Sequence, residues 1–560
     1  MKYTALAMSL FLALGAASPA AMAHKAPLAK KQPFTWANAT VYFLLTDRFN
    51  NGNPANDLAY GRKADSAVMR GYLGGDLAGV TAKIKAGYFN DLGVDAIWIT
   101  PPVEQIHAGT DEGTGKSYGF HGYWVKDFTS VDANVGTEAD VRALVDAAHA
   151  KGLRVLLDVV MNHTGPVTAA DPVWPEEWVR TGPQCTYKDA KTTVECTLVK
   201  NLPDFRTDSD KPVALPPALV AKWKREGRYE REVKELDDFF KTTGLPRASR
   251  YYLMKWHADW VRKYGFDGFR ADTVKHTEPG VWKDLKRIAS SAYEDWKVAN
   301  PGKRVGNDEF YMTAEVYNYS INHARKFDMG GGQFVDFFDN GFDSMINFSM
   351  IGDAKKSYEE LFSSYSAALV GPLNGVSIIN YLSSHDDGGP FDPDRVKPFE
   401  AANKLMLAPG AVQVYYGDET GRYLKVKGAQ GDATLRSFMN WEELAANAQR
   451  PSYKVGDLRA HYSRLGKFRQ AHPAVGAGVH QQISAKPYTF SRIYKNGADS
   501  DRVVVALDLP QDQPSAISVG GVFADGQTVR DYYSGKTAKV ANGKVTFDAR
   551  NSVVLIGEQH

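Results

Sequence analysis

The sequence predicts an α/β protein built as a (β/α)8 TIM barrel, with an inserted domain after strand 3 and a C-terminal antiparallel β-sandwich domain. The barrel is predicted by eight short runs rich in Val, Ile and aromatic residues, which alternate with amphipathic helical segments. Such alternation favours a closed barrel whose working face lies at the carboxyl ends of the strands. After Pro473 the pattern changes to short alternating segments between Gly, Asn and Asp turns, which predicts the β-sandwich.

Eight apolar runs are the predicted barrel strands. In chain order they are Val41–Phe49, Val94–Thr100, Leu153–Asn162, Phe266–Asp272, Phe310–Val316, Phe342–Phe348, Val376–Leu382 and Ala411–Tyr416. The clearest helical segments between them are Glu138–Lys151, Arg250–Tyr264, Val281–Lys297 and Phe399–Leu407. Glycines close several of these segments, as is common at helix C-termini.

The domain bounds follow from the places where this alternation breaks. Residues 1–23 are predicted to be a signal peptide, because Lys2, an apolar run and the small-residue pattern Ala21-Met22-Ala23 precede His24. The barrel is assigned to residues 24–163 and 250–473, and the C-terminal β domain to residues 474–560. Residues 164–249 are far longer than a normal βα loop of about 2 to 6 residues, so we expect an inserted domain B there.

Composition limits the partners and the compartment. With 67 basic and 65 acidic side chains, the chain has no excess charge that would suggest nucleic acid, and an uncharged substrate is expected. The apolar run near the start is too short to cross a membrane, and we expect no membrane insertion. Because the signal predicts export to the periplasm or the medium, Cys185 and Cys196 are expected to form one disulfide rather than a metal site. The charged run from Lys222 to Asp238 is interpreted as a solvated helix face, and we expect a monomer.

Residues 264–276, Tyr-Gly-Phe-Asp-Gly-Phe-Arg-Ala-Asp-Thr-Val-Lys-His, carry the chemistry around which the chain is organised. Arg270 and Asp272 share one face of the predicted strand, because successive side chains point to opposite faces. Taken alone, these two residues are equally well explained as a structural ion pair.

Other strand ends carry further acids. The third strand ends in Asp158-Val159-Val160-Met161-Asn162-His163, and later strands end in Ala314-Glu315-Val316 and Ser384-His385-Asp386. Strand ends of a barrel converge on one mouth, so three carboxylates, two histidines and Arg270 are expected around a single rim. Cleavage of a glycosidic bond needs such a set: a nucleophile, a proton donor and a charge near the reacting carbon.

These four segments resemble the four signature regions of the α-amylase family of glycoside hydrolases, in the same order and on the matching strands. The resemblance covers essentially the whole mature chain, and the secreted and periplasmic bacterial α-amylases look nearest. It implies Asp272 as nucleophile, Glu315 as general acid and base, and Asp386 as the acid that steadies the transition state. It also implies that Arg270 keeps Asp272 ionised and that His163 and His385 hydrogen-bond the sugar.

The resemblance extends to the sugar-binding surface. The segment Tyr118-Gly119-Phe120-His121-Gly122-Tyr123-Trp124 resembles a family segment whose tyrosine stacks on the sugar at the cleavage site. It implies that Tyr123 stacks, with His121 and Trp124 as weaker neighbours. Lys275 and His276 resemble a pair that meets the leaving-group side in α-1,4-acting members. Without the resemblance, these aromatic residues would more simply be core residues.

One or two structural Ca²⁺ ions are implied by the resemblance. Asn162, Asp204 and the His276 carbonyl look like the family site that ties the inserted domain to the barrel. Residues 51–57 and 74–76 are very similar to an N-terminal calcium loop of cyclodextrin glucanotransferases and some α-amylases. The implied ligands of that loop are Asn51, Asn53, Asn56, Asp57, the Gly74 carbonyl and Asp76. Considered without the resemblance, both groups are ordinary turn and hydrogen-bonding residues.

Three functions compete on these observations. The leading one is a retaining, endo-acting α-1,4-glucan hydrolase, an α-amylase that cleaves starch, glycogen or maltodextrins. A transglycosylase like the cyclodextrin glucanotransferases is supported by the shared calcium loop, whereas the single β domain after the barrel argues against it. A non-catalytic glucan-binding protein is the third, because a fold alone never establishes turnover.

Overall fold

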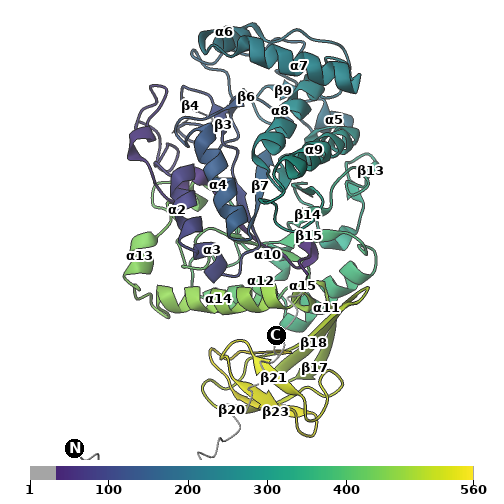
Figure 1. Cartoon of the computed structure of the whole chain (residues 1–560). Coiled ribbons are helices and arrows are strands. Elements are labelled where there is room, and N and C mark those ends of the chain that lie inside the picture. Colours follow the sequence, from purple (N-terminus) through teal and green to yellow (C-terminus); the bar gives the residue numbers. More distant parts are fainter. Residues whose placement is uncertain (1–32, 112, 559–560) are drawn as a thin grey trace, which may run out of the picture.

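Eight parallel strands form a closed barrel at the centre of the chain (Figure 1). The protein is described here from a computed structural model over residues 33–111 and 113–558, so the predicted signal peptide lies outside the described residues. The barrel strands are β1 (Thr40–Leu44), β2 (Ala96–Ile99), β7 (Arg154–Val159), β10 (Gly268–Ala271), β11 (Tyr311–Ala314), β14 (Ser344–Asn347), β15 (Ser377–Asn380) and β16 (Ala411–Tyr415). Seven of them lie within the predicted runs, and β1 begins one residue before its run, which confirms the predicted barrel.

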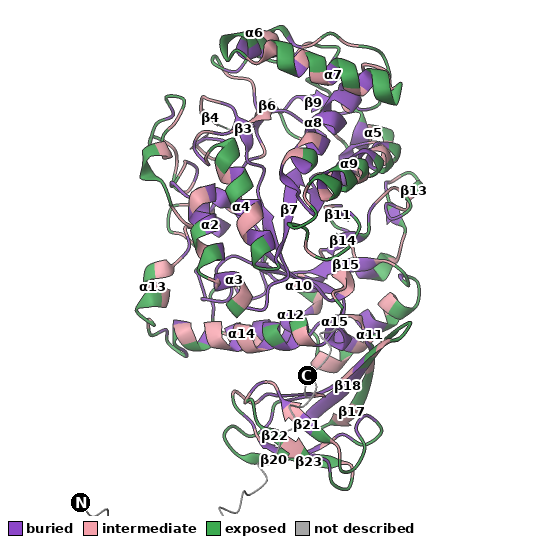
Figure 2. Ribbon diagram, in the orientation of Figure 1, coloured by how far each residue is buried: buried purple, intermediate pink, exposed green. Residues whose placement is uncertain are grey.

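Every barrel strand is buried along its whole length, which explains why its sequence is a continuous apolar run rather than an alternating one (Figure 2). The longer helices around it are α2 (Leu77–Lys85), α4 (Glu138–Ala150), α8 (Ser249–Tyr264), α9 (Pro279–Ala299), α11 (Tyr358–Val370), α12 (Pro398–Met406) and α14 (Val455–Ala471). Shorter helices are α1 (Thr46–Phe49), α3 (Tyr88–Asp91), α10 (Met350–Asp353), α13 (Trp441–Ala445) and α15 (Ala474–Ala477).

Local sequence sets the ends of these helices. Thr137 and Asp140 form a reciprocal capping box at the start of α4. Gly265 ends α8 with a φ of +83°, and a Cβ atom there would lie 2.1 Å from the Trp296 ring of α9. Only glycine therefore allows α8 to turn directly into β10, the strand that carries Arg270.

Two excursions rise above the carboxyl ends of the barrel strands. The first follows β2 and contains β3 (Val103–Gln105), β4 (Thr110–Asp111), β5 (Lys116–Ser117) and β6 (Val125–Val131), none of which is predicted from the sequence. The second follows β7 and contains β8 (Val179–Arg180), α5 (Lys191–Val194), β9 (Asp204–Phe205), α6 (Pro217–Arg225) and α7 (Tyr229–Thr243). The predicted disulfide joins Cys185 to Cys196 within the second excursion.

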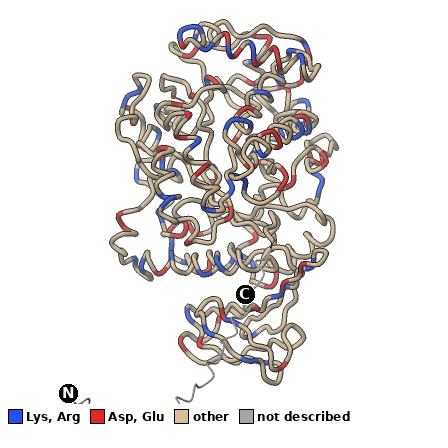
Figure 3. Tube along the Cα trace, in the orientation of Figure 1, with Lys and Arg blue, Asp and Glu red and all other residues tan. Residues whose placement is uncertain are grey.

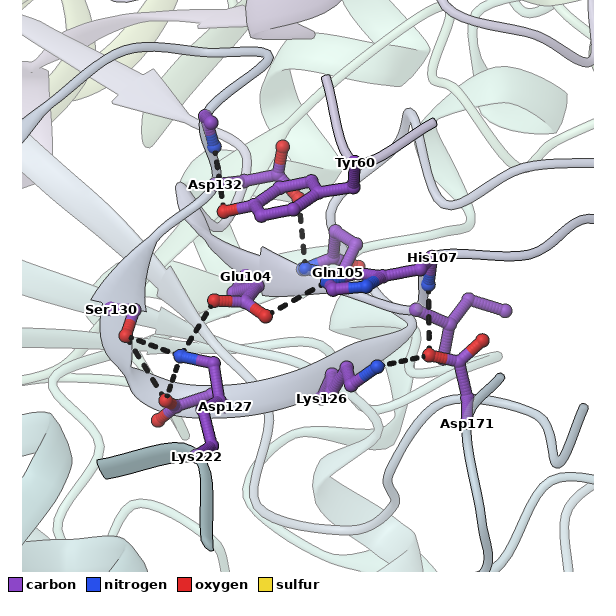
Figure 4. A network of polar contacts seen from close by, with 12 residues as sticks. Tyr60, Glu104, Gln105, His107, Lys126, Asp127, Ser130, Asp132, Asp171 and Lys222 are labelled. Atoms are coloured by element: carbon purple, nitrogen blue, oxygen red, sulfur yellow. Dashed lines mark hydrogen bonds and ion pairs between the residues drawn. The ribbon is translucent and has the colours of Figure 1, made fainter. Parts of the chain in front are cut away.

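Buried ion pairs join the two excursions (Figure 4). Lys222 on α6 places its Nζ 2.8 Å from Glu104 Oε2 on β3 and 2.7 Å from Asp127 Oδ2 on β6. Glu232 on α7 is also buried and pairs with Arg228. The interpretation of residues 222–238 as a solvated face is therefore wrong for these positions, because the inward face of each helix carries charge that is paired on burial.

The C-terminal part consists of two antiparallel sheets. The larger has the strand order β17 (Val479–Ala485), β18 (Tyr488–Asn496), β19 (Asp499–Leu507), β24 (Val554–Glu558), β21 (Thr528–Asp531) and β22 (Thr537–Lys539). The smaller pairs β20 (Pro514–Ser518) with β23 (Lys544–Asp548), and one buried apolar cluster contains side chains from both sheets. This agrees with the predicted antiparallel β domain.

Other small sheets pair β3 with β6, β4 with β5, β8 with β9, and β12 (Phe327–Asp328) with β13 (Phe334–Val335). Positive and negative side chains are interspersed along the trace (Figure 3). Within residues 33–111 and 113–558, no helix is both long enough and apolar enough to cross a bilayer.

Candidate active site

Two of the three predicted catalytic acids, Asp272 and Glu315, lie at the ends of neighbouring strands. Asp272 and Glu315 each follow directly on the last residue of β10 and β11, two strands that pair in register. Asp158 lies on β7, directly opposite Arg270 in the ladder between β7 and β10. The parallel register therefore brings carboxylates from three adjacent strands to the two sides of one arginine.

Arg270 is the hub of this cluster. Its Nη1 lies 2.7 Å from Asp272 Oδ1 and 2.9 Å from Asp158 Oδ1, and its Nη2 lies 3.3 Å from Glu315 Oε2. The guanidinium is fully buried, and the surrounding acids raise its pKa well above the usual value despite the cost of burial. A fixed positive charge therefore stands beside both predicted catalytic carboxylates.

Glu315 has a strongly raised pKa. Burial raises its pKa to about 8; Arg270 opposes this rise and Asp272 adds to it. The backbone N–H of Thr273 donates to Glu315 Oε2 at 2.7 Å and fixes the side chain in place. At neutral pH the carboxyl group is therefore largely protonated, as a general acid must be.

The pKa of Asp386 is shifted in the opposite direction, downward. The partial desolvation of its side chain, which is 47% exposed, would raise its pKa, but His385 and Arg436 hold the pKa well below its usual range. His385 Nε2 lies 2.9 Å from Asp386 Oδ2, and Arg436 Nη2 lies 2.7 Å from Asp386 Oδ1. Asp386 is therefore an ionised carboxylate at any working pH.

Arg436 was not identified from the sequence. It lies beyond β16, pairs with Asp432 one turn earlier, and donates from Nε to the His385 carbonyl oxygen at 3.0 Å. Neither residue belongs to a segment with a recognisable pattern, so only the chain path could place them beside Asp386.

The predicted sugar-binding residues lie around the same acids. The Tyr123 hydroxyl donates to Asp158 Oδ2 at 2.7 Å, and its ring is nearly parallel to His385 at 5.4 Å between centroids. His163 Nε2 lies 3.1 Å from the Tyr123 carbonyl oxygen, and His121 Nδ1 accepts from the Tyr123 N–H at 3.1 Å. Trp124 packs edge-on against His121. Burial lowers the pKa of both His121 and His163, so these two rings are neutral.

A cleft of about 860 Å³ contains all three predicted catalytic acids. Its other lining residues include His121, Tyr123, Trp124, His163, Lys275, His276, Arg70, Tyr187, Tyr317, Asp432 and Arg436. Arg270 and His385 lie beneath this surface and border a smaller cavity of about 20 Å³ behind Glu315.

Two exposed tyrosines that the sequence did not single out line the cleft on either side of Lys275. Tyr187 is 48% exposed and Tyr317 is 46% exposed, and the Lys275 Nζ lies 5.5 Å and 5.2 Å from their ring centres. Tyr317 could have been noticed because it follows Glu315 by two residues. Tyr187 could not, because the disulfide-closed segment that carries it reaches the barrel only in the folded chain.

The first predicted calcium group is brought together around β9. The Phe205 N–H donates to the Asn162 carbonyl oxygen at 2.7 Å, and a β-bridge joins His163 to Asp204. His276 lies close by, with its Nδ1 3.0 Å from the Thr193 carbonyl oxygen. Both carboxylate oxygens of Asp204 are buried without a hydrogen-bond partner among the described residues, which is the condition that a cation relieves.

The second predicted calcium group fits in part. Asn51 Nδ2 donates to Asp57 Oδ1 at 2.9 Å, and Gly74 packs so closely on both residues that a Cβ atom there would clash with them. The Oδ1 atoms of Asn51 and Asn56 are buried and lack partners within the described chain.

The other two side chains of this group are already engaged. Asn53 Oδ1 accepts from the Ala55 N–H. Asp76 caps α2 and accepts backbone N–H groups from Gly52, Asn53 and Gly79. In neither group do three or more His, Cys, Asp or Glu side chains of the described residues gather as a metal site, so amide and carbonyl oxygens would have to complete both.

Comparison of the chain with known proteins identifies its family. The family described as "Alpha amylase, catalytic domain" matches residues 43–454. The periplasmic alpha-amylase of Escherichia coli K12 is 35% identical over 537 residues, covering 85% of this chain and 73% of its own. An alpha-amylase of Streptomyces lividans is 29% identical, over 86% of this chain and 56% of its own. A cyclomaltodextrin glucanotransferase of Geobacillus stearothermophilus is 27% identical, over 86% and 61%.

Solved structures agree on the fold. The alpha-amylase of Geobacillus thermoleovorans in complex with acarbose matches with a TM-score of 0.64 at 21% identity, over 94% of this chain and 100% of its own. The structure of CldA, described as a cyclomaltodextrin glucanotransferase with a three-domain ABC distribution, also matches with a TM-score of 0.64 at 21% identity, over 93% and 99%.

With the barrel, its converging acids and the match over residues 43–454 together, the chain belongs to the α-amylase family of glycoside hydrolases.

Proposed function

We propose that this protein is a retaining, endo-acting α-1,4-glucan hydrolase that cleaves starch, glycogen or maltodextrins. The observation that carries the proposal is the difference between the acids in one cleft. Arg270 contacts Asp272 and Glu315, while the raised pKa of Glu315 keeps that group protonated. A carboxylate in contact with a buried arginine, next to a carboxyl group that keeps its proton, is what a double displacement requires.

In the first step, Asp272 attacks the anomeric carbon while Glu315 gives its proton to the glycosidic oxygen. The bond between that carbon and oxygen breaks, one part of the glucan leaves with a new hydroxyl group, and the other part is esterified to Asp272. In the second step, Glu315 takes a proton from water, whose oxygen attacks the same carbon and releases Asp272. The configuration at the anomeric carbon is retained after two inversions.

The remaining side chains of the site stabilise the charge of the transition state, adjust the pKa of Glu315 or position the sugar. The transition state carries positive charge on the sugar ring, which the ionised carboxylate of Asp386 would stabilise. Arg270 lowers the pKa of Glu315, so the group can also work as a base in the second step. Tyr123, His121 and His163 would position the sugar at the cleavage point.

The cleft is lined by further groups besides the acids, along which several sugar units would bind. Tyr187, Tyr317 and Lys275 flank the end near Glu315, and Arg70 and Asp432 line the cleft as well. An open cleft with lining groups beyond the acids suits internal cleavage of a polymer.

Structural calcium is part of the proposal. Asn162, Asp204 and the His276 carbonyl would hold one ion, and residues 51–57 with 74–76 would hold a second. Unpartnered buried oxygens of Asp204, Asn51 and Asn56 support this assignment. When bound, Ca²⁺ supplies positive charge to buried oxygen atoms and so ties the excursion after β7 to the barrel.

Export is also proposed. The Cys185–Cys196 disulfide suits an oxidising compartment, and the Escherichia coli relative is named as periplasmic. The monomeric state remains a prediction.

The test is turnover of soluble starch with analysis of products. We expect rapid loss of polymer length with one new reducing end for each bond cleaved. Asp272→Asn and Glu315→Gln should each lose activity by a factor of about 10³ or more. Wild-type-like rates in either variant would refute the assignment.

The second candidate is transglycosylation of the cyclodextrin glucanotransferase type. It is favoured by the similarity to such enzymes and by the loop at residues 51–57. A single β domain after the barrel does not argue against transglycosylation, because CldA is described as a cyclomaltodextrin glucanotransferase with a three-domain ABC distribution. Accumulation of cyclic, non-reducing products would replace the hydrolase proposal with this one, whereas binding of glucan without any turnover would favour the non-catalytic alternative.

A further inference from the structure

Residues 185–196 form a loop that the disulfide closes, and this loop carries Tyr187 into the cleft. Tyr187 has a φ of +57°, which is an unfavourable backbone conformation for a bulky residue. Its exposed ring lies 5.8 Å from the ring of His276 and 5.5 Å from Lys275 Nζ. An exposed ring on a strained backbone keeps this place only if the surrounding structure fixes the loop.

Contacts within the loop and to the barrel fix part of it. The Thr192 hydroxyl oxygen accepts the N–H groups of Lys188 at 3.0 Å and Asp189 at 3.1 Å. On α5, the Thr193 carbonyl oxygen accepts a hydrogen bond from His276 Nδ1 at 3.0 Å. These bonds fold the loop and tie its second half to the residues that follow β10.

The tip of the loop, residues 188–190, lies against the β12–β13 hairpin, residues 327–335 (Figure 1). Gln333 Oε1, which is 143 residues further along the chain, accepts the Ala190 N–H at 3.0 Å. Gly330 has a φ of +87°, and a Cβ atom there would lie 2.6 Å from the Lys188 carbonyl oxygen. The backbones of hairpin and loop therefore approach each other as closely as only glycine allows.

The same hairpin also reaches the lysine beside Tyr187. Phe327 on β12 is buried, and Lys275 Nζ lies 5.9 Å from the centre of its ring. Lys275 Nζ also donates to the Tyr317 carbonyl oxygen at 3.4 Å. One hairpin thus contacts both the loop that carries Tyr187 and the side chain that Tyr187 faces across the cleft.

We propose that the β12–β13 hairpin is a positioning element of the cleft, which holds Tyr187 beside Lys275 so that long glucan chains are bound there. Gly330 and Gln333 are the residues through which the hairpin acts on the loop. The inference rests on the proposed glucan hydrolysis and adds to it a determinant of substrate length. If the loop shifts, a long substrate loses its contact with Tyr187, whereas a substrate too short to reach Tyr187 is cleaved as before.

The experiment compares kcat/KM for maltoheptaose with kcat/KM for a short aryl maltoside, and the measured quantity is the ratio of the two. Gly330→Ala pushes against the Lys188 carbonyl, and we expect the ratio to fall about fivefold, mainly through a higher KM for maltoheptaose. Gly332→Ala is the matched control. Gly332 also has a positive φ, of +77°, but no atom of the described residues lies within 4 Å of a Cβ placed there. The ratio for Gly332→Ala should change by less than about 1.5-fold.

A second pair of variants decides the question if Gly330→Ala fails to fold. Gln333 is exposed, so its variants should fold. Gln333→Met removes the oxygen that accepts the Ala190 N–H, and the ratio should fall about threefold. Gln333→Glu keeps an accepting oxygen, and the ratio should stay within about 1.5-fold of the parent value.

The outcomes separate this inference from the proposed function. Unchanged ratios in Gly330→Ala and Gln333→Met, in an enzyme that hydrolyses both substrates, would overturn the role of the hairpin alone. A fall of the same size in Gly332→Ala would also overturn it, because the effect would then not depend on contact with the loop. A parent protein that hydrolyses neither substrate would instead refute the proposed function.

Discussion

Glu315→Gln should abolish turnover and at the same time stabilise the fold. Glu315 is only 13% exposed, and burial raises its pKa from 4.5 to about 8. Because the native state holds a proton that the unfolded chain releases, the stability of the wild-type protein falls as pH rises through this window. Glutamine resembles the protonated acid in shape but has no proton to lose, so the variant escapes this loss.

The size of the effect follows from the pKa shift. At pH 4.5 the variant and the parent should be equally stable. At pH 7, about 2.5 pH units higher, the variant should be more stable by about 3 kcal/mol, since each unit corresponds to about 1.4 kcal/mol. The gain should stop growing near pH 8, where native Glu315 also ionises.

The assay is urea unfolding at several pH values between 5 and 8 in excess Ca²⁺, with the midpoint and slope fitted at each pH. Asp272→Asn is the matched control, because it loses activity as well but weakens a buried 2.7 Å contact with Arg270. We expect that variant to lose about 2 kcal/mol. A Glu315→Gln protein whose stability relative to the parent does not rise with pH would refute the raised pKa and, with it, the assignment of Glu315 as the proton donor.

Three further outcomes are expected. The value of kcat/KM for the wild-type enzyme should fall above about pH 8, because Glu315 then loses its proton. A pH–rate profile whose alkaline limb lies far below pH 8 would contradict this. Arg436→Leu should lower kcat on maltooligosaccharides about 10²-fold in steady-state assays, since Arg436 lies 2.7 Å from Asp386 Oδ1 and helps to keep the pKa of that carboxyl group low. Reduction of the Cys185–Cys196 disulfide should lower the free energy of unfolding by about 3 kcal/mol, measured as a lower urea midpoint. An unchanged midpoint would show that other contacts hold the loop.

The predicted fold could be read from local pattern because the barrel strands are buried on both faces. Each appears as an apolar run, and the glycines at helix ends mark where the chain turns back into the barrel. The excursion after β2 was not predicted because β3, β4 and β5 are each three residues or fewer, and β6, although seven residues long, does not alternate between apolar and polar residues.

The charged segment at residues 222–238 shows a different limit. Its composition indicates solvent exposure, but Lys222 and Glu232 are buried. The partners of Lys222 on β3 and β6 lie about a hundred residues away, whereas Glu232 pairs with Arg228 four residues earlier. No local pattern distinguishes a charge that will be paired from one that will be solvated.

The sequence by itself determined where Asp272, Glu315 and Asp386 would lie, because side chains at the carboxyl ends of the barrel strands all lie at the same opening of the barrel. Only the tertiary structure decided their protonation, since the state of each acid depends on burial and on cations brought from elsewhere. Arg270 lies between Asp272 and Glu315, and Arg436 reaches Asp386 across fifty residues of chain. Electrostatic energy depends on distance in space, which the order of residues along the chain does not specify.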